Sequence, residues 1–139
     1  MREAARRLTA RPACVLAAMV VLALGASQRA EAATADVTSF DAFRVSPYAD
    51  RLSFAYNASW SDENRRCWRD LDFYVNSQHY SDISTWTTTQ QPVNVTGTEN
   101  SLPHTEGSGN YYKIRVWVSD LWNPSIVYAE DAMTDGDWY

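Results

Sequence analysis

Two aspartates on one predicted strand are the residues whose spacing comes nearest to catalytic chemistry. Asp70 and Asp72 alternate with Leu71 and Phe73, so both carboxylates point to the same face of an extended chain. They are separated by about 6.5–7 Å along the strand, a distance that glycosidases use between their two carboxyl groups. Because a small sandwich domain rarely encloses a sugar-cleaving cleft, we expect no catalytic residues.

The two histidines and the acidic end of the chain offer the remaining chemistry. His104 could be combined with an aspartate and a serine, but no nucleophile elbow accompanies it, and His79 has no metal-spaced partner. Residues 130–137, EDAMTDGD, lack the alternating Asp-x-Asp-x-Asp spacing and the closing glutamate of a calcium loop. We therefore expect no metal site, no cofactor, and a frayed acidic tail over 129–139.

Aromatic side chains on one outer sheet face carry the functional prediction. In residues 110–118, Tyr111, Arg115 and Trp117 alternate with apolar residues and point outward. Such a face, with an aromatic residue of the next strand beside it, suits stacking on a sugar or contact with a protein. A tryptophan in the following turn would lie at its rim. The predicted binding residues are Tyr74, Tyr111, Arg115, Trp117 and Trp122.

The same face has a second interpretation, a solvated ladder of ion pairs. Asp70 and Asp72 would pair across strands with Lys113 and Arg115, each pair contributing about 0–1 kcal/mol. In that case Trp117 is a packing residue.

The first 32 residues have the three-part build of an export signal. A basic start precedes the apolar run 13–26, and Ala30-Glu31-Ala32 is a small-residue cleavage site. We predict a secreted, extracellular chain that begins at Ala33, with a retained membrane anchor as the alternative. The remaining 107 residues carry 7 basic and 15 acidic side chains, because the signal removes five arginines and two acids. The resulting charge of −8 disfavours nucleic acid and anionic membranes as partners.

The number of cysteines and the chain length limit how the fold can be stabilised. Cys67 is alone once Cys14 is removed with the signal, so stability must come from one apolar core. We interpret Cys67 as a buried small hydrophobe, with pairing between chains as the alternative. We expect one domain over 33–139, and a monomer.

Short alternating runs separated by polar turns predict an all-β fold: a single antiparallel two-sheet sandwich. Residues 51–60 and 67–76 are expected to form one hairpin and 110–128 a central one. One or two short strands are expected in 77–91, an edge strand in 36–47, a further strand in 92–98, and a long loop over Asn100–Gly109. The predicted core is Leu52, Phe54, Tyr56, Trp60, Leu71, Phe73, Val75, Val93, Val95, Tyr112, Ile114, Val116 and Val118.

A family resemblance adds to this pattern. Leu102-Pro103-His104-Thr105-Glu106, followed by the run from Tyr112 to Val118, is similar to the signature at which the sixth strand of a fibronectin type III domain begins. Trp60 resembles that family's core tryptophan. The resemblance implies an immunoglobulin-like or fibronectin type III-like sandwich, and it implies nothing about function.

These observations favour a secreted, non-catalytic binding module for a carbohydrate or an extracellular protein. The alternative is a small secreted inhibitor of an extracellular hydrolase, which would use the loops Asn100–Gly109 and Asp120–Pro124. A small hydrolytic enzyme is the third possibility.

Overall fold

Seven β-strands run through the computed structural model, which describes residues 32–103 and 109–136. No residue in these ranges is helical, so this part contains no helix that could cross a membrane. The predicted signal segment lies outside the described residues, except for Ala32. The strands are β1 (Ala33–Ser46), β2 (Ala49–Trp60), β3 (Arg65–Val75), β4 (Gln78–Thr88), β5 (Val93–Pro103), β6 (Tyr111–Asp120) and β7 (Val127–Gly136).

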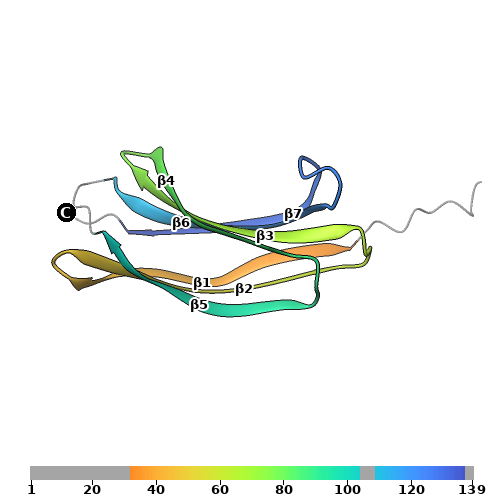
Figure 1. Cartoon of the computed structure of the whole chain (residues 1–139), viewed down its shortest axis with the longest axis horizontal. Helices are drawn as coiled ribbons and strands as arrows, with labels where there is room; N and C mark the ends of the chain where they lie inside the picture. The colour runs from red at the N-terminus through yellow and green to blue at the C-terminus, as the bar shows by residue number, and fades with distance from the viewer. Residues whose placement is uncertain (1–31, 104–108, 137–139) are drawn as a thin grey trace, which may run out of the picture. The chain divides into compact units, whose positions relative to one another are not determined.

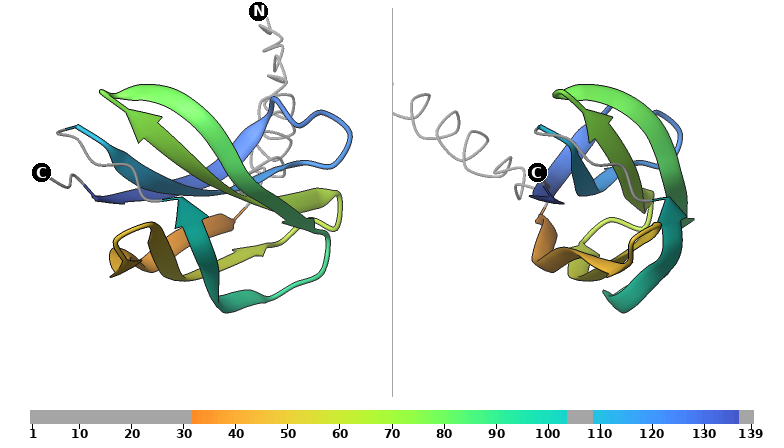
Figure 2. Two further views of the ribbon diagram at one scale, coloured as in Figure 1. Left: turned by 60° about the vertical axis from the view of Figure 1, so that its left-hand side comes forward. Right: turned by 90° about the vertical axis from the view of Figure 1, so that its left-hand side faces the viewer.

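The strands form two antiparallel sheets that pack face to face (Figure 1). One sheet has the order β1-β2-β5 and the other the order β4-β3-β6-β7. The prediction of an all-β, two-sheet antiparallel sandwich is confirmed. In Figure 2, β1 and β7 run along one side of the sandwich, and β4 and β5 run along the other.

Period-2 alternation in the sequence explains which side chains fill the space between the sheets. On β2 and β6, every second residue is buried, and all of these except Asp50 of β2 are apolar, whereas the residues between them are mostly half-buried or exposed. Eleven of the predicted core residues are buried, and Val75 and Val95 are partly buried against them. Cys67 is also buried, as predicted, and burial raises the pKa of its thiol to about 12.

The predicted hairpin between 51–60 and 67–76 is wrong. β2 pairs with β1 and β5, whereas β3 pairs with β4 and β6, so the connection between β2 and β3 passes from one sheet to the other. Alternation identifies the buried face of each strand, but it does not identify the neighbouring strand.

Residues 78–88 form one strand, β4, which agrees with the one or two strands predicted in 77–91. Two other segments differ from expectation. β5 continues to Pro103, into the predicted loop. Ala129–Gly136 belong to β7 and are not a frayed tail. β7 is held there by its pairing with β6 and by two of its acids, Asp131 and Asp135, which bind backbone N–H groups of β1.

The hydroxyl of Tyr112 links β6 to the opposite sheet. It donates a hydrogen bond to Oδ2 of the buried Asp50 at 3.1 Å, and the carbonyl oxygen of Pro103 lies 3.5 Å from it. Burial and the Asp50 carboxylate raise the pKa of Tyr112. The tyrosine therefore packs against the end of β5, near the segment that carries the family resemblance.

Candidate binding surfaces

The outer face of the four-stranded sheet brings together the residues predicted there. β3 and β6 are neighbours, and their register places two aromatic pairs at the ends of the face with two acid–base pairs between them. These pairs are Trp68 with Trp117, Asp70 with Arg115, Asp72 with Lys113, and Tyr74 with Tyr111. The register places the predicted aromatic and charged residues on one surface, but the ion pair of Arg115 is made with Glu130 of β7 and not with an aspartate of β3.

Trp117 does not offer the open ring face that a stacking platform requires. Its side chain is only 9 % exposed. The ring stacks on Trp68, with centroids 5.8 Å apart and planes inclined by 6°, and the Arg115 guanidinium lies 4.4 Å from its centroid. The expectation that the Trp117 side chain is exposed is therefore wrong. Sequence alternation gives the face of a residue, but it does not show how completely neighbouring side chains cover it.

Arg115 is held by β7. Its Nη2 donates a hydrogen bond to Oε2 of Glu130 at 2.7 Å. This hydrogen bond raises the pKa of Arg115 and lowers the pKa of Glu130. Because both side chains remain partly exposed, the pair contributes at most about 1 kcal/mol. Its main effect is to hold the guanidinium over Trp117.

Tyr74 and Tyr111 stack on each other at the far end of the same face. Their ring centroids are 4.9 Å apart and their planes are nearly parallel, at 5°. The ring of His79 meets Tyr74 edge-on at 5.5 Å. Each tyrosine therefore uses one ring face for its neighbour, and both remain half-buried.

One group among the described residues has the donor atoms of a metal site. Nε2 of His79 lies 2.9 Å from Oδ1 of Asp82 and 3.6 Å from Oδ1 of Asp72. Burial and then the Asp70 carboxylate are the largest causes of the raised pKa of Asp72. The side chain of Asp82 is 79 % exposed. The hydrogen bond between His79 and Asp82 is sufficient to explain why these two side chains lie close together. The sequence did not indicate this group, because a register shift in β3–β4 aligns Asp82 with Asp72.

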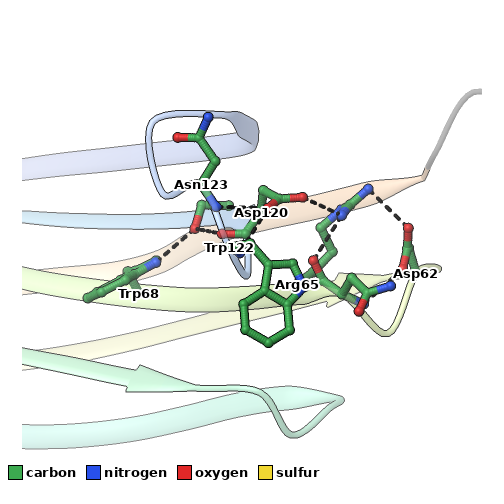
Figure 3. A network of polar contacts seen from close by, with 8 residues as sticks. Asp62, Arg65, Trp68, Asp120, Trp122 and Asn123 are labelled. Carbon is green, nitrogen blue, oxygen red and sulfur yellow. Dashed lines mark hydrogen bonds and ion pairs between the residues drawn. The ribbon is translucent and has the colours of Figure 1, made fainter.

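Trp122, in the loop between β6 and β7, is the exposed aromatic residue of the predicted set. Its side chain is 81 % exposed. Asp120, the last residue of β6, holds the backbone of the loop. Its Oδ1 accepts hydrogen bonds from the backbone N–H groups of Trp122 and Asn123, both at 2.9 Å (Figure 3). These two N–H groups are the leading causes of the lowered pKa of Asp120.

Arg65 anchors the same loop to the start of β3. It is 6 % exposed, and its Nη1 donates to Oδ2 of Asp120 at 3.1 Å, while its Nη2 lies 3.1 Å from Oδ2 of Asp62 (Figure 3). The guanidinium carbon lies 3.9 Å from the ring centroid of Tyr128 in β7. In the sequence this arginine belongs to residues 61–66, SDENRR, whose polar composition is typical of a turn or loop. The alternation that continues backward from Cys67 was the available signal for its inward position.

Backbone hydrogen bonds complete the support of the loop. The N–H of Leu121 donates to the carbonyl of Asn64, and the N–H of Ile126 donates to the carbonyl of Asn123, each at 3.0 Å. The indole N–H of Trp68 donates to Oγ of Ser119 at 2.9 Å, next to the loop (Figure 3). The backbone of the loop at Trp122 is therefore held by Asp120 at the end of β6 and, through Asp120, by Arg65 of β3.

Comparisons with protein-family profiles and with curated protein sequences gave no match to this chain.

Proposed function

We propose that the chain is a secreted, non-catalytic binding module of the fibronectin type III-like or immunoglobulin-like type, and that Trp122 contacts its partner. The two-sheet antiparallel architecture is compatible with such a fold. The hydrogen bond from Tyr112 to Asp50 and the end of β5 beside it support the same assignment.

The observation that carries the proposed function is a large, exposed aromatic side chain on a fixed loop. Binding costs less when the contacting residues are already ordered, because fewer rotamers and backbone conformations are lost. Tryptophan is also among the residues that most often dominate the energy of an interface. The residues at the end of the loop and the start of β7, Ile126, Val127 and Tyr128, are between 36 % and 44 % exposed.

The proposed contact with the partner lies on the β6–β7 loop and not on the outer face of the four-stranded sheet, where the sequence predicted it. Tyr74, Tyr111, Arg115 and Trp117 lie beside one another as predicted, but their rings and charges are largely engaged with their neighbours. In this proposal these four residues stabilise the four-stranded sheet, and Trp117 lies near the end of β6 from which the loop begins. The partner is a carbohydrate or an extracellular protein, since the acidic balance disfavours nucleic acid and anionic membranes.

The test is the change Trp122→Ala, with Tyr48→Ala as its matched control. Tyr48 is 86 % exposed and lies in the β1–β2 turn, at the opposite end of the sandwich from the β6–β7 loop (Figure 1). Partners captured from the culture medium and from a glycan array should bind Trp122→Ala at least tenfold more weakly, a loss typical of an interface anchor. They should bind Tyr48→Ala normally. Equal binding by both variants would reject the loop as the contact.

A second function, inhibition of an extracellular hydrolase, is favoured by the same fixed loop. Inhibitors commonly present an ordered segment that changes little on binding. The other predicted inhibitor loop, Asn100–Gly109, is described only at Asn100–Pro103 and Gly109. A hydrolase inhibition assay on the culture medium separates the two functions, because a simple binding module leaves every hydrolase active.

A further inference from the structure

Three donor side chains meet on the outer face of the four-stranded sheet, near the β3–β4 hairpin. Asp72 comes from β3, and His79 and Asp82 come from β4. One ligand atom of each, an imidazole nitrogen or a carboxylate oxygen, lies within 4.8 Å of the other two. The β3–β4 hairpin is at the opposite end of the sandwich from the β6–β7 loop (Figure 1). This His–Asp–Asp group is therefore separate from the Trp122 loop.

An irregularity in β4 brings two of these side chains to one face. In a regular strand, residues three apart point to opposite faces. The pairing of β4 with β3 shifts by one residue at Tyr80, which has no partner in β3. Such an extra residue is a β-bulge, a feature that often lies beside functional sites and re-aims side chains. The Tyr80 ring packs edge-on against Phe73, while His79 and Asp82 both lie on the outer face beside Asp72.

The distances within the group suit one zinc ion. Nε2 of His79 lies 2.9 Å from Oδ1 of Asp82 and 3.6 Å from Oδ1 of Asp72. Around a tetrahedral zinc ion with bonds of about 2.0–2.1 Å, neighbouring donor atoms are about 3.3–3.4 Å apart. The two measured distances lie on either side of this value. Because Asp82 is mostly exposed and can rotate, small side-chain movements bring the three donors onto one ion.

The two carboxylates of the group lack a fixed positive charge. Asp72 and Asp82 are directly opposite each other in the β3–β4 pairing, a position at which like charges destabilise a sheet. Within residues 32–103 and 109–136, neither forms an ion pair with a lysine or an arginine. Lys113, the neighbour of Asp72 on β6, lies over the ring of Tyr74. His79 is the partner of both carboxylates, and it is charged only when protonated. A bound cation would compensate both.

The donor types select the class of cation. Ca²⁺ and Mg²⁺ prefer shells made of oxygen ligands alone. An imidazole nitrogen together with carboxylates is instead typical of Zn²⁺ and related transition-metal ions. The hydrogen bond between His79 and Asp82 explains their contact, but it does not involve Asp72, whose oxygen is too far from Nε2 for a hydrogen bond. Coordination of one ion accounts for all three side chains.

We propose that Asp72, His79 and Asp82 bind one Zn²⁺ ion through Nε2 of the histidine and one oxygen of each aspartate, with water in the remaining position. Tyr74 helps to position the imidazole, because its ring meets that of His79 edge-on at 5.5 Å. The ion joins the edge strand β4 to β3. The group and the Trp122 loop share no residue, so this inference stands apart from the proposed function.

Isothermal titration with zinc chloride tests the proposal, using purified protein that carries no histidine tag and has been treated with EDTA and dialysed. One Zn²⁺ ion should bind per chain at micromolar concentration. Ca²⁺ and Mg²⁺ should bind at least about tenfold more weakly, because neither favours an imidazole ligand. Failure to bind Zn²⁺ would overturn the proposal. Equal binding of Ca²⁺ would also overturn it, since a merely acidic surface would then explain the result.

Two variants assign the binding to this group. Asp82→Asn and His79→Ala change side chains that are 79 % and 47 % exposed, so both should keep the fold, which far-UV circular dichroism checks. Each should bind Zn²⁺ at least about tenfold more weakly, because loss of even a residue that supports a metal ligand typically costs roughly 10–100-fold in affinity. Asp36→Asn removes an exposed carboxylate of β1 and should bind like the natural protein.

A spectroscopic measurement identifies the nitrogen ligand directly. Zn²⁺ should shift the NMR signals of the His79 ring, which are assigned as the histidine signals that disappear in His79→Ala. Unchanged Zn²⁺ binding by both variants, or His79 signals that do not move when the ion binds, would refute the proposal.

Discussion

Oδ2 of Asp131 in β7 accepts a hydrogen bond from the backbone N–H of Val37 in β1 at 2.8 Å. Oδ2 of Asp135 does the same for the N–H of Ala42 at 2.7 Å. β1 is an edge strand, and edge N–H groups left open can pair with another chain. The two acids therefore close the β1–β7 side of the sandwich without a further strand.

We predict that Asp131→Ala lowers the free energy of unfolding by about 1.5–3 kcal/mol, the range for a hydrogen bond to a charged group. Val37 is 2 % exposed, so water cannot readily replace the lost acceptor. Urea denaturation followed by tryptophan fluorescence measures the change. Asp41→Ala, at an exposed position of β1, is the control and should stay within about 0.5 kcal/mol of the natural protein. A loss no greater than that of the control would show that the β1–β7 side is held by other contacts.

The roles of Asp131 and Asp135 could not be predicted from the sequence. In the sequence they belong to an acidic stretch that resembles a solvated tail, because acceptance of a backbone N–H from a strand more than ninety residues away leaves no local signal. Alternation in β2, β3 and β6 was sufficient to predict the core and the fold class. The neighbours of β2 and β3 could not be predicted, because two consecutive strands with buried faces fit either a hairpin or a crossing between sheets.

The candidate site was predictable to a similar extent. Trp122 was placed at the rim by the turn residues around it, and the structure leaves it exposed. The sequence pattern predicted the correct sheet face for Trp117. It did not predict how far the ring is buried, because that depends on contacts with Trp68 of the neighbouring strand β3 and with Arg115 of the same strand, β6. Arg65 was missed because charged residues are rarely buried, and only its contacts show that it points inward.

We predict that Trp117→Ala destabilises the fold by about 3 kcal/mol, the lower end of the range for truncating a buried aromatic residue. The change removes the stack on Trp68 and leaves Arg115 over an empty space. Chemical denaturation should show the loss, whereas Trp122→Ala should change stability by less than about 1 kcal/mol. Similar stability of the two variants would contradict the assignment of Trp117 to packing. A binding defect in Trp117→Ala therefore requires a folding control before it is attributed to contact with a partner.

Stability should fall as the pH rises from about 9 to 12. The pKa of Cys67 and of Tyr56 is raised to about 12 in the folded chain, in both cases chiefly by burial, and that of Tyr112 is raised as well. The unfolded chain releases these protons near pH 8.5–10. It then binds fewer protons than the folded chain, so the free energy of unfolding decreases with pH. Urea titrations at several pH values measure the slope. Cys67→Ala should flatten it near pH 9–10, and an unchanged slope there would show that Cys67 is not the group responsible.

The fixed position of Trp122 should depend on the charge of Asp120. The pKa of this carboxyl is lowered, first by the N–H of Asn123 and then by that of Trp122, so the loop's stabilisation is complete above the unfolded pKa of about 3.9. It is lost as the pH falls through the lower folded pKa. Amide hydrogen exchange at Trp122 and Asn123 should therefore accelerate in Asp120→Ala at neutral pH. Asp120→Asn keeps one acceptor oxygen for the two N–H groups and should show a smaller acceleration. If the proposed function is correct, binding should weaken in the same order, Asp120→Ala more than Asp120→Asn, while the exposed indole itself is intact. Loss of amide protection with full binding would show that a preformed loop is unnecessary for recognition.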